Sequence, residues 1–331
     1  MDGADAISTP RFLHDFERTG APLPALPAGV HLFQNVLNPA YSPRHCLQRL
    51  SESRISYHPS PQDACLDHIC GKEHVRAWAL DYSYEASATA ADGVGVSIYV
   101  AASTTDAFAM LTSGHAGLQT FREILFPDNG GECRFFVDWD EKLAPNSAEL
   151  RSLTSRARAV RDRVRHLASV FKSTVDDLLA IEAFSARGAN ASVSDPIVST
   201  TDRVDMLSFH AVFPGYCFQS VTDLLFFASW FQGAWRDHCT SAGGPANYID
   251  ALDFATYRKR CRRTMGNKRT LYARKSMKPG HARVLGKPQG APTQSDFCAH
   301  LVWSPTPRND VLLSSLILFP WLGKRKRSPE D

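Results

Sequence analysis

Two carboxylates at the end of an apolar segment are the residues of this sequence best suited to metal chemistry. Asp138 and Asp140 follow Phe135-Phe136-Val137, a run of aromatic and β-branched residues that predicts a buried strand. Side chains two residues apart on a strand point to the same face, so both carboxylates should share one face, with Cα atoms about 6–7 Å apart. This spacing suits a shared Mg²⁺ or Mn²⁺ ion, because both ions prefer oxygen ligands.

Two more polar groups follow in the chain and could complete a site. Ser208 and His210 alternate with apolar residues, so they should share one face of a second strand. Asp253 precedes Tyr257 and a run of Arg and Lys residues, and nearby Asp250 is an alternative to Asp253. Phosphoryl transfer to a nucleotide needs such a set: carboxylates to hold two divalent ions, and His, Arg and Lys to neutralise a triphosphate.

Each of these groups by itself also has a structural interpretation. An Asp-x-Asp pair is commonly solvated at a strand end, a strand histidine is commonly a hydrogen-bonded core residue, and a lone aspartate is commonly a helix cap. The order of the three groups along one chain, together with their flanking residues, is what favours a shared site.

The positive charge of the chain is concentrated in one stretch. Of its 37 Lys and Arg residues, 12 lie between Phe254 and Ser295, and none of its 34 Asp and Glu residues lies there. The net charge is only +3, so the rest of the chain is acidic. A basic stretch on an acidic body predicts a local polyanion site, with a solvated basic loop as the alternative.

Composition and cysteine usage predict a globular intracellular protein. The 331 residues suffice for one large domain or two lobes, and 44% hydrophobic and 21% charged residues are ordinary values. No apolar run approaches the roughly 20 residues that cross a bilayer, and the eight scattered cysteines favour a reducing compartment. The start of the chain lacks the pattern of a secretory or mitochondrial leader. Lys324-Arg325-Lys326-Arg327 is either a nuclear import signal or a solvated tail, so we expect the nucleus rather than the mitochondrion.

Strands and helices are predicted in alternation along the chain. Besides the Asp-Trp-Asp strand, strands are predicted over 94–100 and 206–213, the latter ended by Pro214-Gly215, and a helix or strand over 312–319. Helices are predicted over 106–111 with Thr105 as N-cap, from 147 to 171, and over 221–235, whereas 185–203 is predicted to be a loop. The arginines of the second helix are interpreted as a solvated face, and its apolar stripe consists of Leu150, Leu153, Ala157, Val160, Val164, Leu167 and Phe171.

The three polar groups resemble the motifs of the archaeo-eukaryotic primase superfamily, most closely its PrimPol-like branch. The first family motif, a strand ending in Asp-x-Asp or Asp-x-Glu, is matched by 132–140. The second, Ser-x-His on a strand, is matched by Ser208-Phe209-His210. The third is an Asp followed four residues later by Tyr, then by Arg residues and a Lys, and it is matched by Asp253, Tyr257, Arg260, Arg263 and Lys268. Leu313–Ile317 looks like the segment that closes the family's core, so the resemblance covers roughly residues 80–320.

This resemblance implies an α/β fold of the α+β type. We expect a two-lobed primase catalytic core with an RRM-like sheet that carries the metal aspartates. Residues 1–77 should form an N-terminal arm or helical-loop region, 78–320 the catalytic core, and 321–331 a basic tail.

The resemblance also implies roles for individual residues. Asp138, Asp140 and Asp253 would hold two Mg²⁺ or Mn²⁺ ions. The incoming triphosphate would bind to Ser208, His210, Arg260, Arg263 and Lys268, with Arg258 and Arg262 as alternatives to Arg260. Template or primer phosphates would contact Arg258, Arg262, Arg274, Lys275 and Lys278.

The activity implied is template-directed nucleotidyl transfer by a DNA primase and/or DNA polymerase, of the kind that serves replication, translesion synthesis and DNA damage tolerance. Its partners would be a single-stranded DNA template and primer, ribo- or deoxynucleoside triphosphates, and single-strand-binding or replication proteins, without a membrane. No Cys/His-rich module follows the core, although the branch commonly carries one, so we expect primer extension to exceed de novo priming. The alternatives are a catalytically silent, nucleic-acid-binding primase-like subunit and a metal-dependent nuclease.

Overall fold

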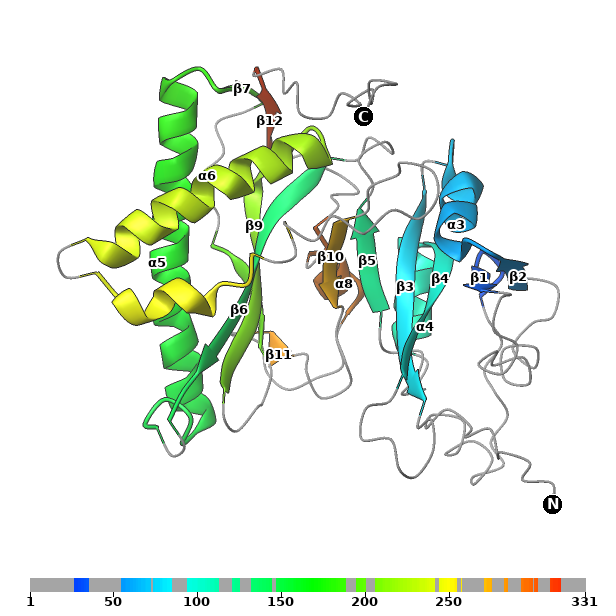
Figure 1. Cartoon of the computed structure of the whole chain (residues 1–331), viewed down its shortest axis with the longest axis horizontal. Coiled ribbons are helices and arrows are strands. Elements are labelled where there is room, and N and C mark those ends of the chain that lie inside the picture. The colour runs from blue at the N-terminus through cyan, green and yellow to red at the C-terminus, as the bar shows by residue number, and fades with distance from the viewer. Residues whose placement is uncertain are drawn as a thin grey trace, which may run out of the picture.

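The computed structural model is a mixed α+β protein with two six-stranded sheets side by side (Figure 1). Neighbouring strands are antiparallel except for two parallel pairs, so the predicted α+β class is confirmed at this level. The structure describes residues 27–35, 55–72, 74–84, 94–112, 121–125, 132–144, 147–188, 195–200, 206–241, 244–254, 257, 271–275, 283–284, 293–299, 301–302 and 310–316.

The first sheet has the strand order β10-β5-β3-β4-β1-β2. Its strands are β1 (His31–Asn35), β2 (Ile55–His58), β3 (Val75–Tyr84), β4 (Val94–Ser103), β5 (Phe121–Leu125) and β10 (Leu271–Lys275). Helix α3 (Pro61–Ile69) packs on it, because Cys65, Leu66 and Ile69 form an apolar cluster with residues of β1, β3, β4 and β5. Helices α4 (Thr104–Thr112) and α8 (Gln294–Ala299) meet where the Phe297 ring lies 5.7 Å from that of Phe108.

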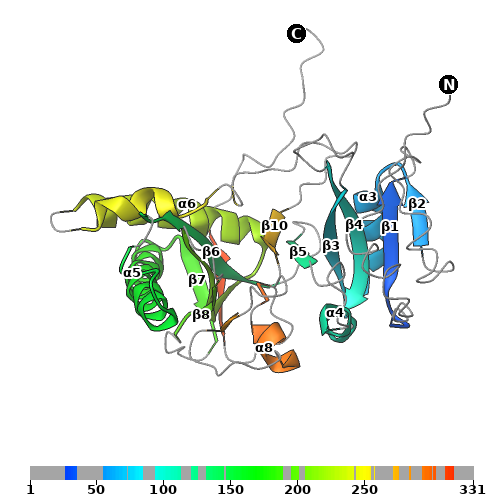
Figure 2. The same cartoon turned by 90° about the horizontal axis from the view of Figure 1, so that it is seen from below.

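The second sheet has the order β11-β8-β9-β12-β7, and β6 pairs with the remaining edge of β9. Its strands are β6 (Cys133–Lys142), β7 (Phe184–Arg187), β8 (Ile197–Thr200), β9 (Met206–Phe218), β11 (Arg283–Val284) and β12 (Val311–Ser315). The long helices α5 (Leu153–Ala180) and α6 (Val221–Thr240) pack on this sheet, and the short 3₁₀ helix η5 (Ala246–Ala251) follows α6. Both views place α5 on the side of the sheet away from the first sheet (Figures 1 and 2).

Residues 301–302 connect the two sheets. The backbone N–H of Val302 donates to the buried carboxylate of Glu123 on β5 at 2.9 Å, and its carbonyl accepts from the N–H of Arg134 on β6 at 2.7 Å. The edge of the first sheet on this side is β10, the strand that belongs to the basic stretch (Figure 2). Strand β10, one of the described parts of the basic stretch, therefore lies on the side of the first sheet that faces the second sheet.

Several predicted elements are confirmed, and their ends are corrected by local hydrogen bonds. The strands over 94–100 and 133–140 and the helices over 106–111 and 221–235 are present and extend beyond those bounds. The N-cap of α4 is Ser103 rather than Thr105, because the Ser103 hydroxyl accepts from the Asp106 N–H at 3.0 Å. Similarly, α5 begins at Leu153 rather than at 147, since the Ser152 hydroxyl caps it by accepting from the Ser155 N–H.

Two predictions about the second sheet are wrong. The region predicted as a loop over 185–203 contains most of β7 and all of β8. Strand β9 does not end at Pro214-Gly215 but continues to Phe218. Gly215 has a φ of 95°, which glycine adopts without strain, and its N–H donates to Asp310 at 2.8 Å. The carboxylate of Asp310 thus replaces the ladder hydrogen bond, and the strand passes through the irregularity.

The last apolar segment forms a strand, β12, and pairs with β9 and β7. The division at residues 77 and 78 falls within β3, and the three-part domain organisation stays a prediction. No helix in the described part of the chain is both long and apolar enough to cross a membrane.

Candidate functional site

The strands that carry the first two motifs are direct neighbours. β6 and β9 pair antiparallel, with Asp138 opposite His210 and Asp140 opposite Ser208. Residues opposite each other in an antiparallel pair have side chains on the same face. The Nε2 atom of His210 lies 3.0 Å from Oδ1 of Asp138, and the two side chains are 22% and 29% exposed. The pairing therefore brings together four predicted site residues from two distant segments.

Burial along β6 confirms that the two aspartates share a face. Asp138 is half-buried and Asp140 exposed, whereas Val137, Trp139 and Glu141 between and beside them are buried. The buried residues face α5 and α6, so they hold the strand against the core. Asp138 and Asp140 alternate with these residues, so they consequently lie on the opposite face of β6.

The third motif lies along the free edge of β6. The N–H of Asp253 donates to the carbonyl of Asp138 at 2.9 Å, and Leu252 forms an isolated β-bridge with Trp139. Asp250 lies three residues earlier in η5, so the backbone contact with β6 falls to Asp253. A strand edge exposes unpaired N–H and C=O groups. The segment after η5 provides a hydrogen-bond partner for one of them, the carbonyl of Asp138.

Tyr257 also forms hydrogen bonds with the free edge of β6. Its hydroxyl donates to the carbonyl of Phe136 at 2.6 Å and accepts from the N–H of the same residue at 3.3 Å. Burial raises the pKa of Tyr257 well above its usual value, so the hydroxyl stays a donor at physiological pH. The Asp-x-x-x-Tyr spacing thus has a structural role here: both of its residues bond to the first motif strand.

Replacing Tyr257 by Phe is expected to lower the free energy of unfolding by about 1–3 kcal/mol, because the N–H and C=O of Phe136 lose their partner. Urea denaturation followed by circular dichroism would measure this change. The matched control is Tyr216→Phe, because the described residues offer the half-buried Tyr216 hydroxyl no hydrogen bond. Equal stabilities of the two variants would contradict the assigned role.

The cationic part of the predicted site falls mostly outside the described residues. This holds for Arg258, Arg260, Arg262, Arg263, Lys268 and Lys278. Arg274 and Lys275 lie in β10, where the backbone alone is described, opposite Glu123 and Arg122 of β5. The roles predicted for these residues therefore stay predictions.

The aspartate pair offers the donor chemistry that Mg²⁺ or Mn²⁺ needs. Mg²⁺ is usually held by one or two carboxylates together with water and substrate phosphates, and Asp138 and Asp140 present such a pair on one face. Across the described part of the chain, no three His, Cys, Asp or Glu side chains already converge closely enough to hold an ion. The two aspartates thus fit an ion as a pair, and Asp253 is joined to them by its backbone hydrogen bond.

Sequence reasoning missed two groups of residues around this site. Ser199 of β8 lies opposite His210 on the other edge of β9, so Asp138, His210 and Ser199 form one row across three strands. Behind the row, Glu141 and Arg163 form a buried ion pair. A signal for this pair exists in the sequence: Glu141 occupies a core position of β6, and Arg156 and Arg163 lie seven residues apart on the buried side of α5.

The chain has no match among models of known protein families, and a search of curated proteins finds none either.

Proposed function

We propose that this chain catalyses template-directed nucleotidyl transfer as a DNA primase and/or DNA polymerase of the PrimPol-like type. One observation carries the proposal: the β6–β9 pairing and the edge contact of Asp253 bring three separate motifs to one place on the second sheet. A shared site requires such a meeting, because its residues come from segments that are far apart in the sequence. The two-lobed primase core, with its RRM-like sheet, is part of the same proposal.

In this proposal the acidic residues bind the metal ions, and Ser208 and His210 bind the nucleotide. Asp138, Asp140 and Asp253 would hold two Mg²⁺ or Mn²⁺ ions, which would supply activation of the primer 3′-hydroxyl and charge stabilisation of the departing pyrophosphate. Ser208 and His210 bind the incoming triphosphate by hydrogen bonds to its charged oxygens. A new bond forms between the 3′-oxygen and the α-phosphorus as the α–β phosphoanhydride bond breaks.

The basic stretch supplies the nucleic-acid surface in this proposal. Its strand β10 lies at the edge of the first sheet next to the second sheet (Figure 1). Phosphates of a template and primer bound between the sheets would meet this stretch, and such contacts release counterions and make binding salt-dependent.

The test is incorporation of labelled deoxy- or ribonucleotides on primed and unprimed single-stranded DNA, with Mg²⁺ or Mn²⁺. We expect extension of the primed template to exceed synthesis on the unprimed one, because de novo synthesis must also hold a second free nucleotide in place. Salt-sensitive template binding without incorporation would instead identify a silent primase-like subunit. Shortening of the labelled primer without nucleotides would identify a nuclease.

Replacing His210 by Ala is expected to lower kcat/KM for the nucleotide by about 10- to 100-fold, the range of one lost charge-assisted hydrogen bond. Template affinity, measured by fluorescence anisotropy, should be unchanged. The matched control is His74→Ala, an exposed histidine before β3. A loss of template affinity with normal nucleotide use would contradict the role given to His210.

A further inference from the structure

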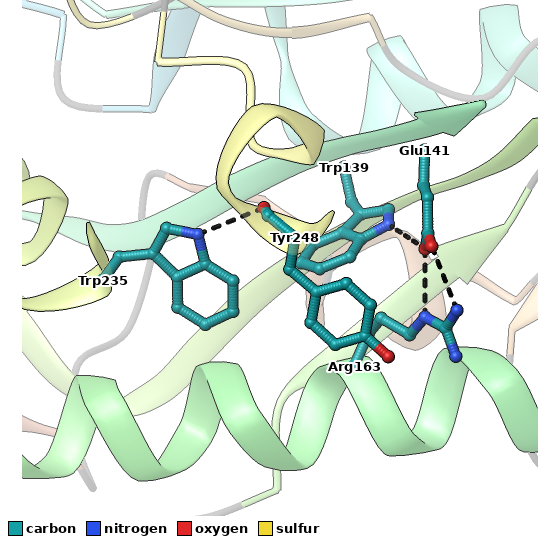
Figure 3. A network of polar contacts seen from close by, with 5 residues as sticks. All are labelled: Trp139, Glu141, Arg163, Trp235 and Tyr248. Atoms are coloured by element: carbon teal, nitrogen blue, oxygen red, sulfur yellow. Dashed lines mark hydrogen bonds and ion pairs between the residues drawn. The ribbon is translucent and has the colours of Figure 1, made fainter. Parts of the chain in front are cut away.

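A buried ion pair lies directly behind the predicted metal carboxylates. Glu141 on β6 is 5% exposed and Arg163 on α5 is 7% exposed. The guanidinium of Arg163 donates to both Glu141 carboxylate oxygens, from Nε at 3.0 Å and from Nη2 at 3.1 Å. The indole Nε1 of Trp139 donates to the same carboxylate at 3.2 Å (Figure 3). Trp139 lies between Asp138 and Asp140 in the sequence of β6. Its hydrogen bond to the Glu141 carboxylate therefore fixes the strand at the point where both aspartates project.

Tyr248 of η5 connects a second segment to this ion pair. The Cζ atom of Arg163 lies 4.8 Å from the centroid of the Tyr248 ring, a cation–π contact. The Tyr248 ring also packs edge-on against the ring of Trp139, with 5.2 Å between the centroids. The backbone carbonyl of Tyr248 accepts a hydrogen bond from the indole of Trp235 at 3.4 Å (Figure 3). Arg163 therefore contacts both β6, through Glu141, and η5, through Tyr248.

The segment that Tyr248 holds leads directly to Asp253. η5 ends at Ala251, Leu252 bridges to Trp139, and the N–H of Asp253 bonds to the carbonyl of Asp138. The two segments that carry the three carboxylates are thus tied to one helix, α5, through a single guanidinium.

Stability alone does not explain an ion pair at this place. Replacing a buried pair by apolar residues of similar volume is often neutral or stabilising, because desolvation offsets the attraction of the charges. Burial acts to lower the pKa of Arg163, but the hydrogen bond and charge of Glu141 outweigh it and raise that pKa, so the guanidinium stays a cation. Unlike apolar packing, a planar guanidinium fixes the orientation of its partners. It forms two parallel hydrogen bonds in its plane and stacks against an aromatic ring.

We propose that Arg163, acting through Glu141 and Tyr248, is a positioning residue that sets the place of Asp253 relative to Asp138 and Asp140. The catalytic meaning of this inference rests on the proposed nucleotidyl transfer, whereas the positioning itself can be measured without any activity.

The first test compares Tyr248→Leu with Tyr248→Phe. The leucine variant removes the ring and leaves the Glu141–Arg163 pair in place, whereas the phenylalanine variant keeps the ring. In Tyr248→Leu we expect faster amide hydrogen exchange over 252–253, with unchanged exchange in β7 and β12. We also expect about 10- to 100-fold weaker binding of Mn²⁺, measured by electron paramagnetic resonance, which is the usual effect of losing an outer-shell contact. Tyr248→Phe should match the wild type in both measurements.

The second test removes the ion pair without leaving a buried charge. In Glu141→Gln with Arg163→Met the Gln side chain still offers an acceptor to Trp139. We expect the thermal stability of this double variant to be close to that of the wild type. Its amide exchange over 252–253 should be as fast, and its Mn²⁺ binding as weak, as in Tyr248→Leu. The control is Asp162→Asn with Arg165→Met, which removes a solvent-exposed ion pair from the same helix.

The outcomes separate this inference from the proposed function. Wild-type exchange over 252–253 and wild-type Mn²⁺ affinity in Tyr248→Leu would overturn the positioning role, even if the enzyme is active. An inactive wild-type protein that binds no Mn²⁺ would overturn the proposed function, while the exchange measurement would still decide on the positioning role. If the double variant does not fold, the Tyr248 pair of variants decides alone.

Discussion

Replacing Asp138 and Asp140 together by Ala is expected to abolish nucleotide incorporation on a primed template. Both carboxylates project from one face of β6, and the pair is the part of the site that fits an ion. Removing both leaves no carboxylate on that face of the strand to hold Mg²⁺ or Mn²⁺, so the loss should reach the background of the assay at every ion concentration tested.

The fold should tolerate this double substitution. Removing two like charges that share a site relieves repulsion. The lost contact between Asp138 and His210 is partly solvated, and such pairs contribute about 0–1 kcal/mol. Asp176→Ala with Asp177→Ala is the matched control, since it removes two aspartates from the exposed surface of α5. Incorporation at the wild-type rate in Asp138→Ala with Asp140→Ala, confirmed as folded by circular dichroism, would refute the assignment of the metal site.

Replacing Phe135 by Ala is expected to lower the free energy of unfolding by about 3–5 kcal/mol. Phe135 is fully buried, and its ring lies 4.7 Å from Phe231 of α6, 5.4 Å from Phe213 of β9 and 5.6 Å from Phe171 of α5. The cavity left by the ring would therefore open at the junction of both long helices with the second sheet. A loss of this size is a large part of the roughly 5–15 kcal/mol that stabilise an ordinary domain.

Denaturant titration followed by tryptophan fluorescence would measure the effect of Phe135→Ala. The control is Leu153→Ala at the start of α5, where the side chain is 54% exposed and the change should stay within about 0.5 kcal/mol. A destabilisation below about 1 kcal/mol in Phe135→Ala would show that α5, α6 and the second sheet do not pack together around this ring.

The local part of the site could be predicted from the sequence. A two-residue period on a strand places Asp138 with Asp140, and Ser208 with His210, on single faces, whatever the strands pair with. The strands themselves were recognisable because apolar and β-branched or aromatic residues surround these polar ones. For this reason the face of Asp138 and Asp140 is confirmed by the burial pattern of β6. The predicted end of β9, which depends on its tertiary contacts, is wrong.

Interactions between distant segments account for the predictions that failed. The short strands β7 and β8 carry too little periodic pattern to predict, and they form because β12 and β9 offer backbone partners. The pattern of α5 predicts a solvated face for its arginines, but Arg156 and Arg163 are buried. Burial of a guanidinium depends on an acceptor from another element, here Met206 O for Arg156 and Glu141 for Arg163. The seven-residue spacing of the two arginines shows that they share one side of α5, but it does not identify those acceptors.

The sequence by itself determined the residue types of the site and the strand faces that carry them, because side-chain alternation is a local property of the backbone. Only the tertiary structure decided that β6 and β9 are neighbours in the register that sets Asp138 opposite His210. It also decided that Asp253, and not Asp250, bonds to the edge of β6. Register and edge contacts arise from backbone N–H and C=O groups, which are the same in every residue except proline. Their choice of partner is therefore made by the packing of Trp139, Tyr248 and Arg163 around them.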